Sequence, residues 1–286
     1  MSPSRNDRHL IPIPHGPQAA YAAANGSEAV PGPRGFVPVT PALAIAPSVS
    51  VVIPALNEAQ NLPHVFATLP SWIHEVVLVD GRSTDETVAV AQRLRPDLRI
   101  VVQSGRGKGD ALVAGFQACT SDIIVMIDAD GSTDGGEIVA FVSALVAGAD
   151  YAKGSRFANG GGSDDITFVR RLGNRVLHMI VNRLFGTRFT DLCYGYNAFW
   201  ARHLDVLDLD CPGFEIETLM NIRAALAGLR IQEIPSHERS RIHGTSNLRA
   251  FRDGWRILKV IFRERQRRPS GRTAPARSPA ADQGAA

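Results

Sequence analysis

Short apolar runs rich in β-branched residues alternate along the first half of the chain with longer segments in which apolar residues recur every three or four positions. The runs cover residues 50–53, 75–79, 100–102 and 123–127. Apolar stripes of helical spacing lie between and after them, at Leu62, Val65, Phe66 and Leu69, at Leu112, Phe116 and Cys119, and at Ile138, Phe141, Val142 and Leu145. This alternation predicts an α/β fold, a mostly parallel sheet with helices on both faces.

The pattern loosens after about residue 155. A Gly-rich loop is followed by a long helix through 168–180 and an irregular segment over 190–200. A helix is expected over 214–227, ended by a glycine, and a strand over 229–234, ended before a proline. Ser83 and Glu86 have the spacing of a capping box for the second helix.

Both ends of the chain lack either periodicity. Residues 1–47 are rich in Pro, Ala and Gly, and residues 265–286 in Arg, Pro, Ser and Ala, so both are expected to be disordered tails. The 286 residues contain 44% hydrophobic residues, enough for one substantial core. We therefore expect a single domain over 48–264.

Bulk properties exclude several classes of protein. The net charge of +3 is too small to indicate a nucleic-acid partner. The three cysteines form no CxxC pair, which argues against structural zinc and disulfides and fits a reducing, cytoplasmic compartment. No apolar stretch approaches the roughly 20 residues of a membrane span, and no secretory signal is evident.

Polar residues cluster where the predicted strands end. They are Asn57 and Glu58, Asp80, Lys108, and Asp128 with Asp130. Open α/β sheets bind ligands beyond the carboxyl ends of their strands, so these side chains are expected to share one site. Asp128-Ala129-Asp130 could place two carboxylates around Mg²⁺ or Mn²⁺ that also binds substrate phosphate, although a solvated turn has the same residues.

The ordered set of motifs over about 48–250 resembles glycosyltransferase family 2, with its Rossmann-like GT-A fold. The segments that carry this resemblance are 52–58, 79–85, 105–109 and 128–130. Downstream segments are similar to the dolichol-phosphate or polyprenyl-phosphate mannose synthase branch, namely 154–157, 190–191, 213–217 and 241–246. The resemblance implies a nucleotide-sugar and metal side over 48–155 and an acceptor side and lid over 156–246.

The resemblance also implies roles for individual residues. Donor base and ribose would be held by Pro54, Asn57, Glu58 and Asp80, with Lys108 near the base or phosphates. Asp128 and Asp130 would hold the Mg²⁺ or Mn²⁺ cofactor on the diphosphate. Gly81-Arg82 stands where many relatives have Asp-Gly, and Ser132 where several have Gln, so UDP- and GDP-sugars both stay open.

An acceptor phosphate would suit arginine, because the guanidinium group binds phosphate through two hydrogen bonds. The candidates are Arg156, Arg170, Arg171 and Arg175, each with the alternative of a solvated basic face. A hydroxyl acceptor would instead need a general base, for which the candidates are Asp191, Glu215 and Glu217. The segment with Arg241, His243 and Ser246 resembles a lid that closes over donor and metal.

The last helix, expected over about 246–263, combines an apolar stripe with interleaved basic residues. The stripe is Leu248, Phe251, Trp255, Leu258 and Phe262, and the basic residues are Arg249, Arg252, Arg256, Lys259 and Arg263. Such a helix could lie on an anionic membrane surface, which would place the protein peripherally on the inner membrane face. Alternatively its apolar face packs on the domain while the arginines extend to solvent.

The leading hypothesis is an inverting glycosyltransferase that moves a hexosyl unit from a nucleotide sugar to polyprenyl phosphate. A soluble hydroxyl acceptor, a metabolite or a glycan, is the second hypothesis. A non-catalytic nucleotide-sugar-binding module is the alternative from another class. A nucleotidyltransferase is disfavoured because its Gly-rich, Arg-containing loop is missing near Pro54. A receiver-like domain is disfavoured because Lys108 precedes Asp128.

Overall fold

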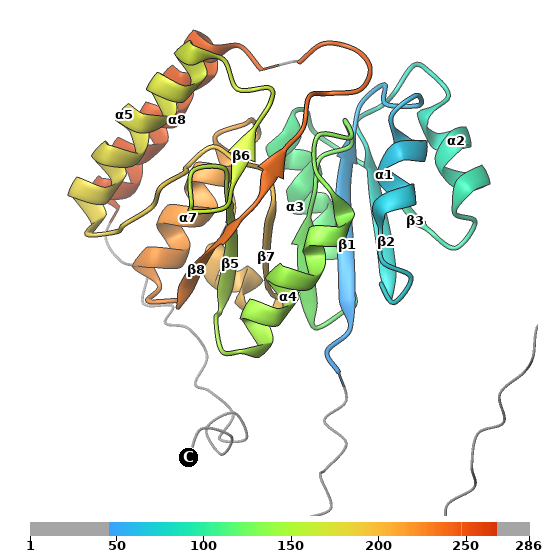
Figure 1. Cartoon of the computed structure of the whole chain (residues 1–286), viewed down its shortest axis with the longest axis horizontal. Helices are drawn as coiled ribbons and strands as arrows, with labels where there is room; N and C mark the ends of the chain where they lie inside the picture. The colour runs from blue at the N-terminus through green and yellow to red at the C-terminus, as the bar shows by residue number, and fades with distance from the viewer. Residues whose placement is uncertain (1–45, 247, 268–286) are drawn as a thin grey trace, which may run out of the picture. The chain divides into compact units, whose positions relative to one another are not determined.

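The computed structural model describes residues 46–246 and 248–267. The N-terminal tail expected over 1–47 and the basic tail expected over 265–286 fall almost entirely outside these residues. The described part forms one compact unit, built on a sheet of seven strands in the order β3-β2-β1-β4-β7-β5-β8 (Figure 1). No helix within it is long and apolar enough to cross a bilayer.

The first half follows the predicted alternation closely. Its strands and helices are β1 (Val49–Ala55), α1 (Leu62–Thr68), β2 (Glu75–Asp80), α2 (Thr87–Leu94), β3 (Arg99–Val102), α3 (Lys108–Ala118), β4 (Ile123–Met126), a 3-10 turn (Gly135–Glu137), α4 (Ile138–Val146) and β5 (Tyr151–Ser155). β1 pairs in parallel with β2 and β4, and β2 with β3. The predicted parallel core of the sheet is therefore confirmed.

The second half contains β6 (Gly162–Ser163), α5 (Phe168–Phe185), β7 (Asn197–Trp200), a 3-10 turn (Ala201–His203), α6 (Leu204–Leu207), α7 (Ile216–Leu226), β8 (Ile231–Pro235), β9 (His237–Glu238) and α8 (Ala250–Gln266). β7 runs antiparallel between β4 and β5, whereas the sequence suggested only an irregular segment there. β8 includes Pro235, contrary to expectation. It lies at the sheet edge, where a residue without an N–H is tolerated.

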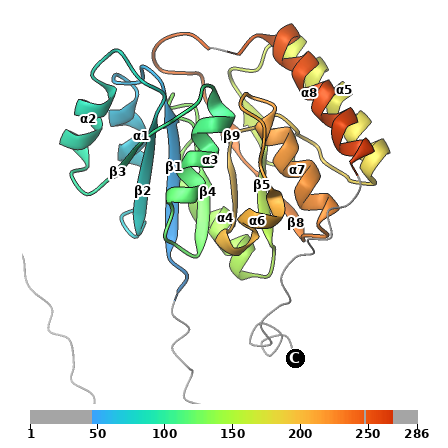
Figure 2. The same ribbon diagram turned by 180° about the vertical axis from the view of Figure 1, so that it is seen from behind.

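Alternate residues of the central strands enter two separate cores. Val51 and Ile53 pack under α1 and α4, whereas Val52 faces α3 and α7 (Figures 1 and 2). Both faces of the sheet are therefore covered, which explains why β1, β2 and β4 are nearly continuous apolar runs. The expected capping box is wrong. The Ser83 hydroxyl accepts a hydrogen bond from the Asn57 backbone, and α2 begins later, at Thr87, without a side-chain cap.

Helices α5 and α8 lie side by side at one end of the molecule. A third core joins them to α7 through Leu177, Val181, Ile222, Ile257 and Ile261. α8 begins four residues later than expected, at Ala250 rather than 246, and continues to Gln266. Its packed face is Ile257, Val260 and Ile261, so the predicted stripe through Phe251, Trp255 and Phe262 points outward instead.

Candidate functional site

A cavity of about 840 Å³ opens at the carboxyl ends of the strands. One arm is lined by residues at or after the ends of β1, β3 and β4, among them Pro54, Glu58, Lys108, Asp128 and Asp130. The other arm continues between α5 and α8. The strand-end residues therefore share one site, as parallel topology requires, and a second region of the chain extends it.

Lys108 lies between two carboxylates at the centre of the cavity. Its Nζ is 2.5 Å from Asp128 Oδ1 and 2.6 Å from Glu217 Oε1. Burial by itself would lower the pKa of Lys108, but the two carboxylates outweigh it and raise the pKa above its ordinary value. Burial raises the pKa of Glu217, and Lys108 opposes that rise. The ammonium group is a fixed positive charge beside Asp128.

Close backbone packing positions Lys108. A Cβ atom on Gly107 or Gly109 would lie 2.4 Å from the carbonyl oxygen of Pro212 or 2.0 Å from that of Cys211. The backbone N–H of Gly109 donates to the Pro212 carbonyl at 2.9 Å. Glycine at these positions lets the start of α3 pack directly on the loop that leads into α7, and this contact brings Lys108 to Glu217.

Asp130 forms an ion pair with a different cation, Arg241. Arg241 Nη2 lies 3.1 Å from Asp130 Oδ2, and its Nη1 lies 2.9 Å from Glu58 Oε1. Burial would lower the pKa of Arg241, but these carboxylates raise it. Arg241 thus connects the loops after β1 and β4 to the segment that precedes α8.

Hydrogen bonds to α5 and to the residue before α1 position the rest of that segment. The backbone N–H of His243 donates to Asn61 Oδ1 at 3.0 Å, and Asn61 Nδ2 donates to the His243 carbonyl. The Ser246 hydroxyl accepts a hydrogen bond from Arg170 Nη2 at 3.0 Å. Of the three residues predicted for a lid, Arg241 and Ser246 line the cavity, whereas His243 lies outside the lining and is bound to Asn61 through its backbone. The lid role stays a prediction.

Of the four residues expected around base and ribose, only Pro54 and Glu58 line the cavity. Asn57 has a left-handed backbone (φ 58°), and its Oδ1 accepts a hydrogen bond from the Thr84 backbone at 2.8 Å. Asp80 accepts one from the Ser83 backbone at 3.1 Å. In this geometry Asn57 joins the loops after β1 and β2, whereas Asp80 binds the loop that follows its own strand. Gln103 lines the same arm, and the sequence pattern did not single it out.

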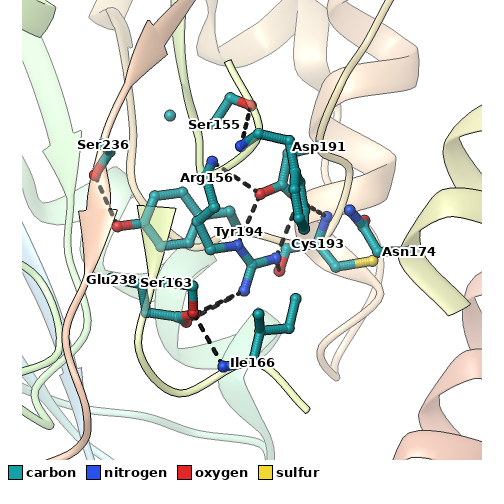
Figure 3. A network of polar contacts seen from close by, with 12 residues as sticks. Ser155, Arg156, Ser163, Ile166, Asn174, Asp191, Cys193, Tyr194, Ser236 and Glu238 are labelled. Atoms are coloured by element: carbon teal, nitrogen blue, oxygen red, sulfur yellow. Dashed lines mark hydrogen bonds and ion pairs between the residues drawn. The ribbon is translucent and has the colours of Figure 1, made fainter. Parts of the chain in front are cut away.

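Arg156 is the centre of a buried polar network (Figure 3). Its Nε and Nη2 donate to Asp191 at 2.7 and 3.0 Å, its Nη1 donates to Glu238 at 3.1 Å, and Nη2 also donates to the Cys193 carbonyl. Burial raises the pKa of Asp191, but Arg156 outweighs that and holds the pKa below its ordinary value. The Arg156 guanidinium lines the cavity while its donors point to protein acceptors.

The three arginines of α5 predicted for the acceptor phosphate differ in position. Arg170 lines the cavity, where its other partner is Asp165 at 3.2 Å. Arg171 stacks loosely on Phe157, and Arg175 is exposed outside the cavity lining. Asn174, one turn after Arg170, also lines the cavity, and sequence reasoning missed it. The i, i+4 spacing on one helix face was the available signal.

The three candidate bases also differ. Asp191 is fully buried beneath Arg156 and Lys153, outside the cavity lining. Glu215 is buried beside the Gly213 backbone, which donates to it, and does not line the cavity either. Glu217 alone among them lines it, next to Lys108. None of these distances tests catalysis, so the base assignment stays a prediction.

The donor atoms at Asp128 and Asp130 suit a hard divalent cation shared with a diphosphate. Both carboxylates line the cavity, and a Cβ on Gly195 would lie 2.7 Å from Asp128 Oδ2, so glycine keeps this space open. Within the described residues no group of three or more His, Cys, Asp or Glu side chains could hold a metal by itself. The remaining ligands would have to be substrate or water oxygens, as is usual for Mg²⁺.

Comparison with known proteins gives the family. Residues 50–207 match the Glycosyl transferase family 2 profile. The chain is 30% identical over 219 residues to glycosyltransferase AglJ of Haloferax volcanii, covering 76% of this chain and 71% of the relative. It is also 30% identical over 226 residues to the polyprenol monophosphomannose synthase of Mycolicibacterium smegmatis, covering 74% and 84%.

Solved structures share the fold. A glucosyl-3-phosphoglycerate synthase from Mycobacterium tuberculosis, in complex with Mn²⁺, UDP and phosphoglyceric acid, superposes with a TM-score of 0.60. The sequence identity is 21%, over 79% of this chain and 81% of that one. The expected GT-A fold and the resemblance to the polyprenyl-phosphate branch are thereby confirmed. The chain belongs to glycosyltransferase family 2 and is a glycosyltransferase enzyme.

Proposed function

We propose that this enzyme transfers a hexosyl unit from a nucleotide sugar to polyprenyl phosphate with inversion at the anomeric carbon. The observation that carries the proposal is the continuity of the cavity. A polar arm at Lys108, Asp128 and Asp130 leads past Arg170 into an apolar arm between α5 and α8. This shape suits a charged donor and an amphiphilic acceptor that meet in the middle.

In the proposed reaction an anionic oxygen of the acceptor phosphate attacks the anomeric carbon of the sugar. The bond from that carbon to the diphosphate breaks, and its electron pair leaves with the nucleoside diphosphate. Because the attacking oxygen is already anionic, no general base is required. This fits a site in which Asp191 is buried under Arg156 and Glu217 is paired with Lys108.

The cation and the charged side chains would act on the leaving group. Asp128 and Asp130 would hold Mg²⁺ or Mn²⁺, which when bound would stabilise the negative charge that develops on the diphosphate. Lys108 supplies a second, fixed positive charge next to Asp128. Arg241, which pairs with Asp130 and Glu58, would close the segment over the donor.

For the acceptor phosphate we propose Arg170 as the principal cation. It lines the cavity between the two arms, and its present partners are the partly exposed Asp165 and the exposed Ser246. Arg156 would attract the phosphate through its positive charge without a direct hydrogen bond, since its hydrogen-bond donors already have protein acceptors. We give Arg171 and Arg175 no direct contact, because they lie outside the cavity lining.

We further propose that the enzyme contacts an anionic membrane peripherally, on the inner face. Phe251, Trp255 and Phe168 are 87%, 61% and 78% exposed on α8 and α5. Arg252, Lys259 and Arg175 lie on the same two helices, a combination that suits an interface with anionic lipid. Val169 and Phe251 are exposed and also line the cavity, so its apolar arm reaches this surface.

One experiment tests donor and acceptor together. Purified enzyme with Mn²⁺ would be incubated with labelled UDP- and GDP-hexoses, each combined with polyprenyl phosphate or with soluble alcohols, and extracted with organic solvent. We expect label in the organic phase with one donor. Label that stays aqueous, with product formed on a soluble alcohol, would overturn the lipid acceptor in favour of a metabolite or glycan.

Membrane contact has its own assay. A larger fraction of the enzyme should sediment with vesicles that contain phosphatidylglycerol than with vesicles of pure phosphatidylcholine, because anionic headgroups attract the basic residues of α8. Replacing Phe251 and Trp255 together by serine should reduce sedimentation strongly. Equal sedimentation of that variant and the unaltered enzyme would exclude this surface as the contact.

A further inference from the structure

The apolar arm of the cavity passes between two helices, each of which has a glycine where it lines the arm. These are Gly173 of α5 and Gly254 of α8. A Cβ atom built on either glycine meets no other atom within 4 Å. Glycine inside a helix is unfavourable relative to alanine, and no steric contact requires it at these two positions.

Other helical glycines of this chain have a packing reason. A Cβ on Gly109 would overlap the Cys211 carbonyl, and one on Gly115 would lie 2.4 Å from Val52. Gly173 and Gly254 differ because the space beside them is open and belongs to the cavity. They keep a passage free rather than bring two segments together.

The passage ends where the helices meet. One turn further along each helix, Leu177 and Ile257 line the cavity and also belong to the core shared by α5, α7 and α8. At the other end, Val169 and Phe251 line the cavity and are exposed to solvent. The passage is therefore an apolar channel with a packed end and an open end, and the two glycines lie between these ends.

A polar group without a partner lies at the side of this channel. Asn174 is 4% exposed and lines the cavity. Its Oδ1 accepts a hydrogen bond from the Leu192 backbone at 3.0 Å, while its Nδ2 has no hydrogen-bond partner within the described residues. A buried amide donor is normally paired, so a ligand with a hydrogen-bond acceptor is expected beside it. An apolar chain that ends in a charged or polar head has this chemistry.

We infer that Gly173 and Gly254 are specificity-determining residues, which set the width of the channel that receives the apolar chain next to the acceptor's phosphate. The inference rests on the proposed lipid-phosphate acceptor. A prenyl chain carries methyl branches and is wider than a straight alkyl chain, so it needs the space that two missing side chains leave. Larger residues at these two positions exclude the prenyl chain and leave the polar arm of the cavity unchanged.

The test compares Gly173→Leu and Gly254→Leu with the unaltered enzyme, using undecaprenyl phosphate in detergent and the preferred nucleotide sugar. We expect kcat/KM for undecaprenyl phosphate to fall at least tenfold in each variant. The Kd of the nucleoside diphosphate, measured by calorimetry with Mn²⁺, should change less than twofold. Val176→Leu is the matched control, because Val176 is exposed on α5 outside the cavity lining, and it should keep full kcat/KM.

Misfolding is controlled by Gly173→Ala and Gly254→Ala. Alanine favours the helix, so both variants should keep or raise the thermal midpoint while kcat/KM falls less than in the leucine variants. Unchanged kcat/KM in both leucine variants, with an active unaltered enzyme, would overturn this inference and leave the proposed function intact. An unaltered enzyme that is inactive on undecaprenyl phosphate would overturn both.

Discussion

The ammonium group of Lys108 lies 2.5 Å from a carboxylate oxygen of Asp128, although the two residues come from different loops of the sheet edge. Glu217, 109 positions further along the chain than Lys108, completes the group. The proposed metal-binding motif therefore has a protein cation at one carboxylate and, through Arg241, another at the second. A diphosphate with its divalent cation would enter a site in which Lys108 and Arg241 already place positive charge beside the two carboxylates.

Replacing Lys108 by methionine should weaken donor binding. The substitution keeps an unbranched side chain of nearly the same length but leaves Asp128 and Glu217 as two close carboxylates without their shared cation. We expect the KM for the nucleotide sugar to rise about tenfold or more, because a hydrogen bond to a charged group is typically worth about 1.5–3 kcal/mol and the proposed role of Lys108 is to bind the donor phosphates. Steady-state kinetics with each substrate varied in turn measures it, and an equal rise in the acceptor KM would contradict a donor-side role.

Asp130→Asn should nearly abolish transfer. It preserves shape while removing one carboxylate charge, and about a hundredfold or greater loss of kcat is expected when charge stabilisation of the leaving group is lost. Mn²⁺-dependent binding of the nucleoside diphosphate, measured by calorimetry, should weaken in parallel. Asp97→Asn, at an exposed turn beside Arg95, serves as the control. Unchanged turnover of Asp130→Asn would refute a metal site at this residue.

Two glycine-to-alanine changes in helices should alter stability in opposite directions. Gly109→Ala would place a Cβ 2.0 Å from the Cys211 carbonyl, so we expect it to lower the free energy of unfolding by about 1–3 kcal/mol or more. Gly173→Ala meets open space and should raise it by up to about 1 kcal/mol. Urea unfolding followed by circular dichroism measures both, and the same sign for both would contradict the packing described.

The Arg156–Asp191 pair predicts a specific dependence of stability on pH. Because Asp191 has a pKa below its ordinary value of 3.8 in the folded state, its ionised form stabilises the protein above about pH 4. That contribution disappears as the pH falls through the lowered pKa. Asp191→Asn should lose about 3 kcal/mol or more at pH 7, since it removes one of the two carboxylates that pair with the buried Arg156 and leaves only Glu238.

Urea unfolding between pH 7 and pH 2 provides the measurement. The difference between the unaltered enzyme and Asp191→Asn should be constant above about pH 4 and shrink below it. Asp164→Asn, on an exposed ion pair with His237, should follow the unaltered enzyme. A variant with full stability but no transferase activity would argue that Asp191 acts in catalysis rather than in this network.

The sequence by itself determined the parallel part of the sheet and the position of the polar arm of the cavity. Glu58, Lys108 and Asp128 follow apolar runs of strand length, and parallel topology brings the ends of those strands to one edge. These predictions depend only on local periodicity and on the geometry of parallel strands. They needed no knowledge of which side chains touch.

Tertiary structure decided the partners of those residues. Arg241 meets Glu58 across 183 positions, and Arg156 is enclosed by Asp191 and Glu238. It also decided that α8 packs through Ile257 and Ile261 while Phe251 and Trp255 face outward. The local pattern predicts an amphipathic helix. It does not decide which face is buried when apolar residues occur on several faces of the helix, because the neighbouring helices select that face. For the same reason, only the packing of α5 on α8 shows that their two glycines border one channel.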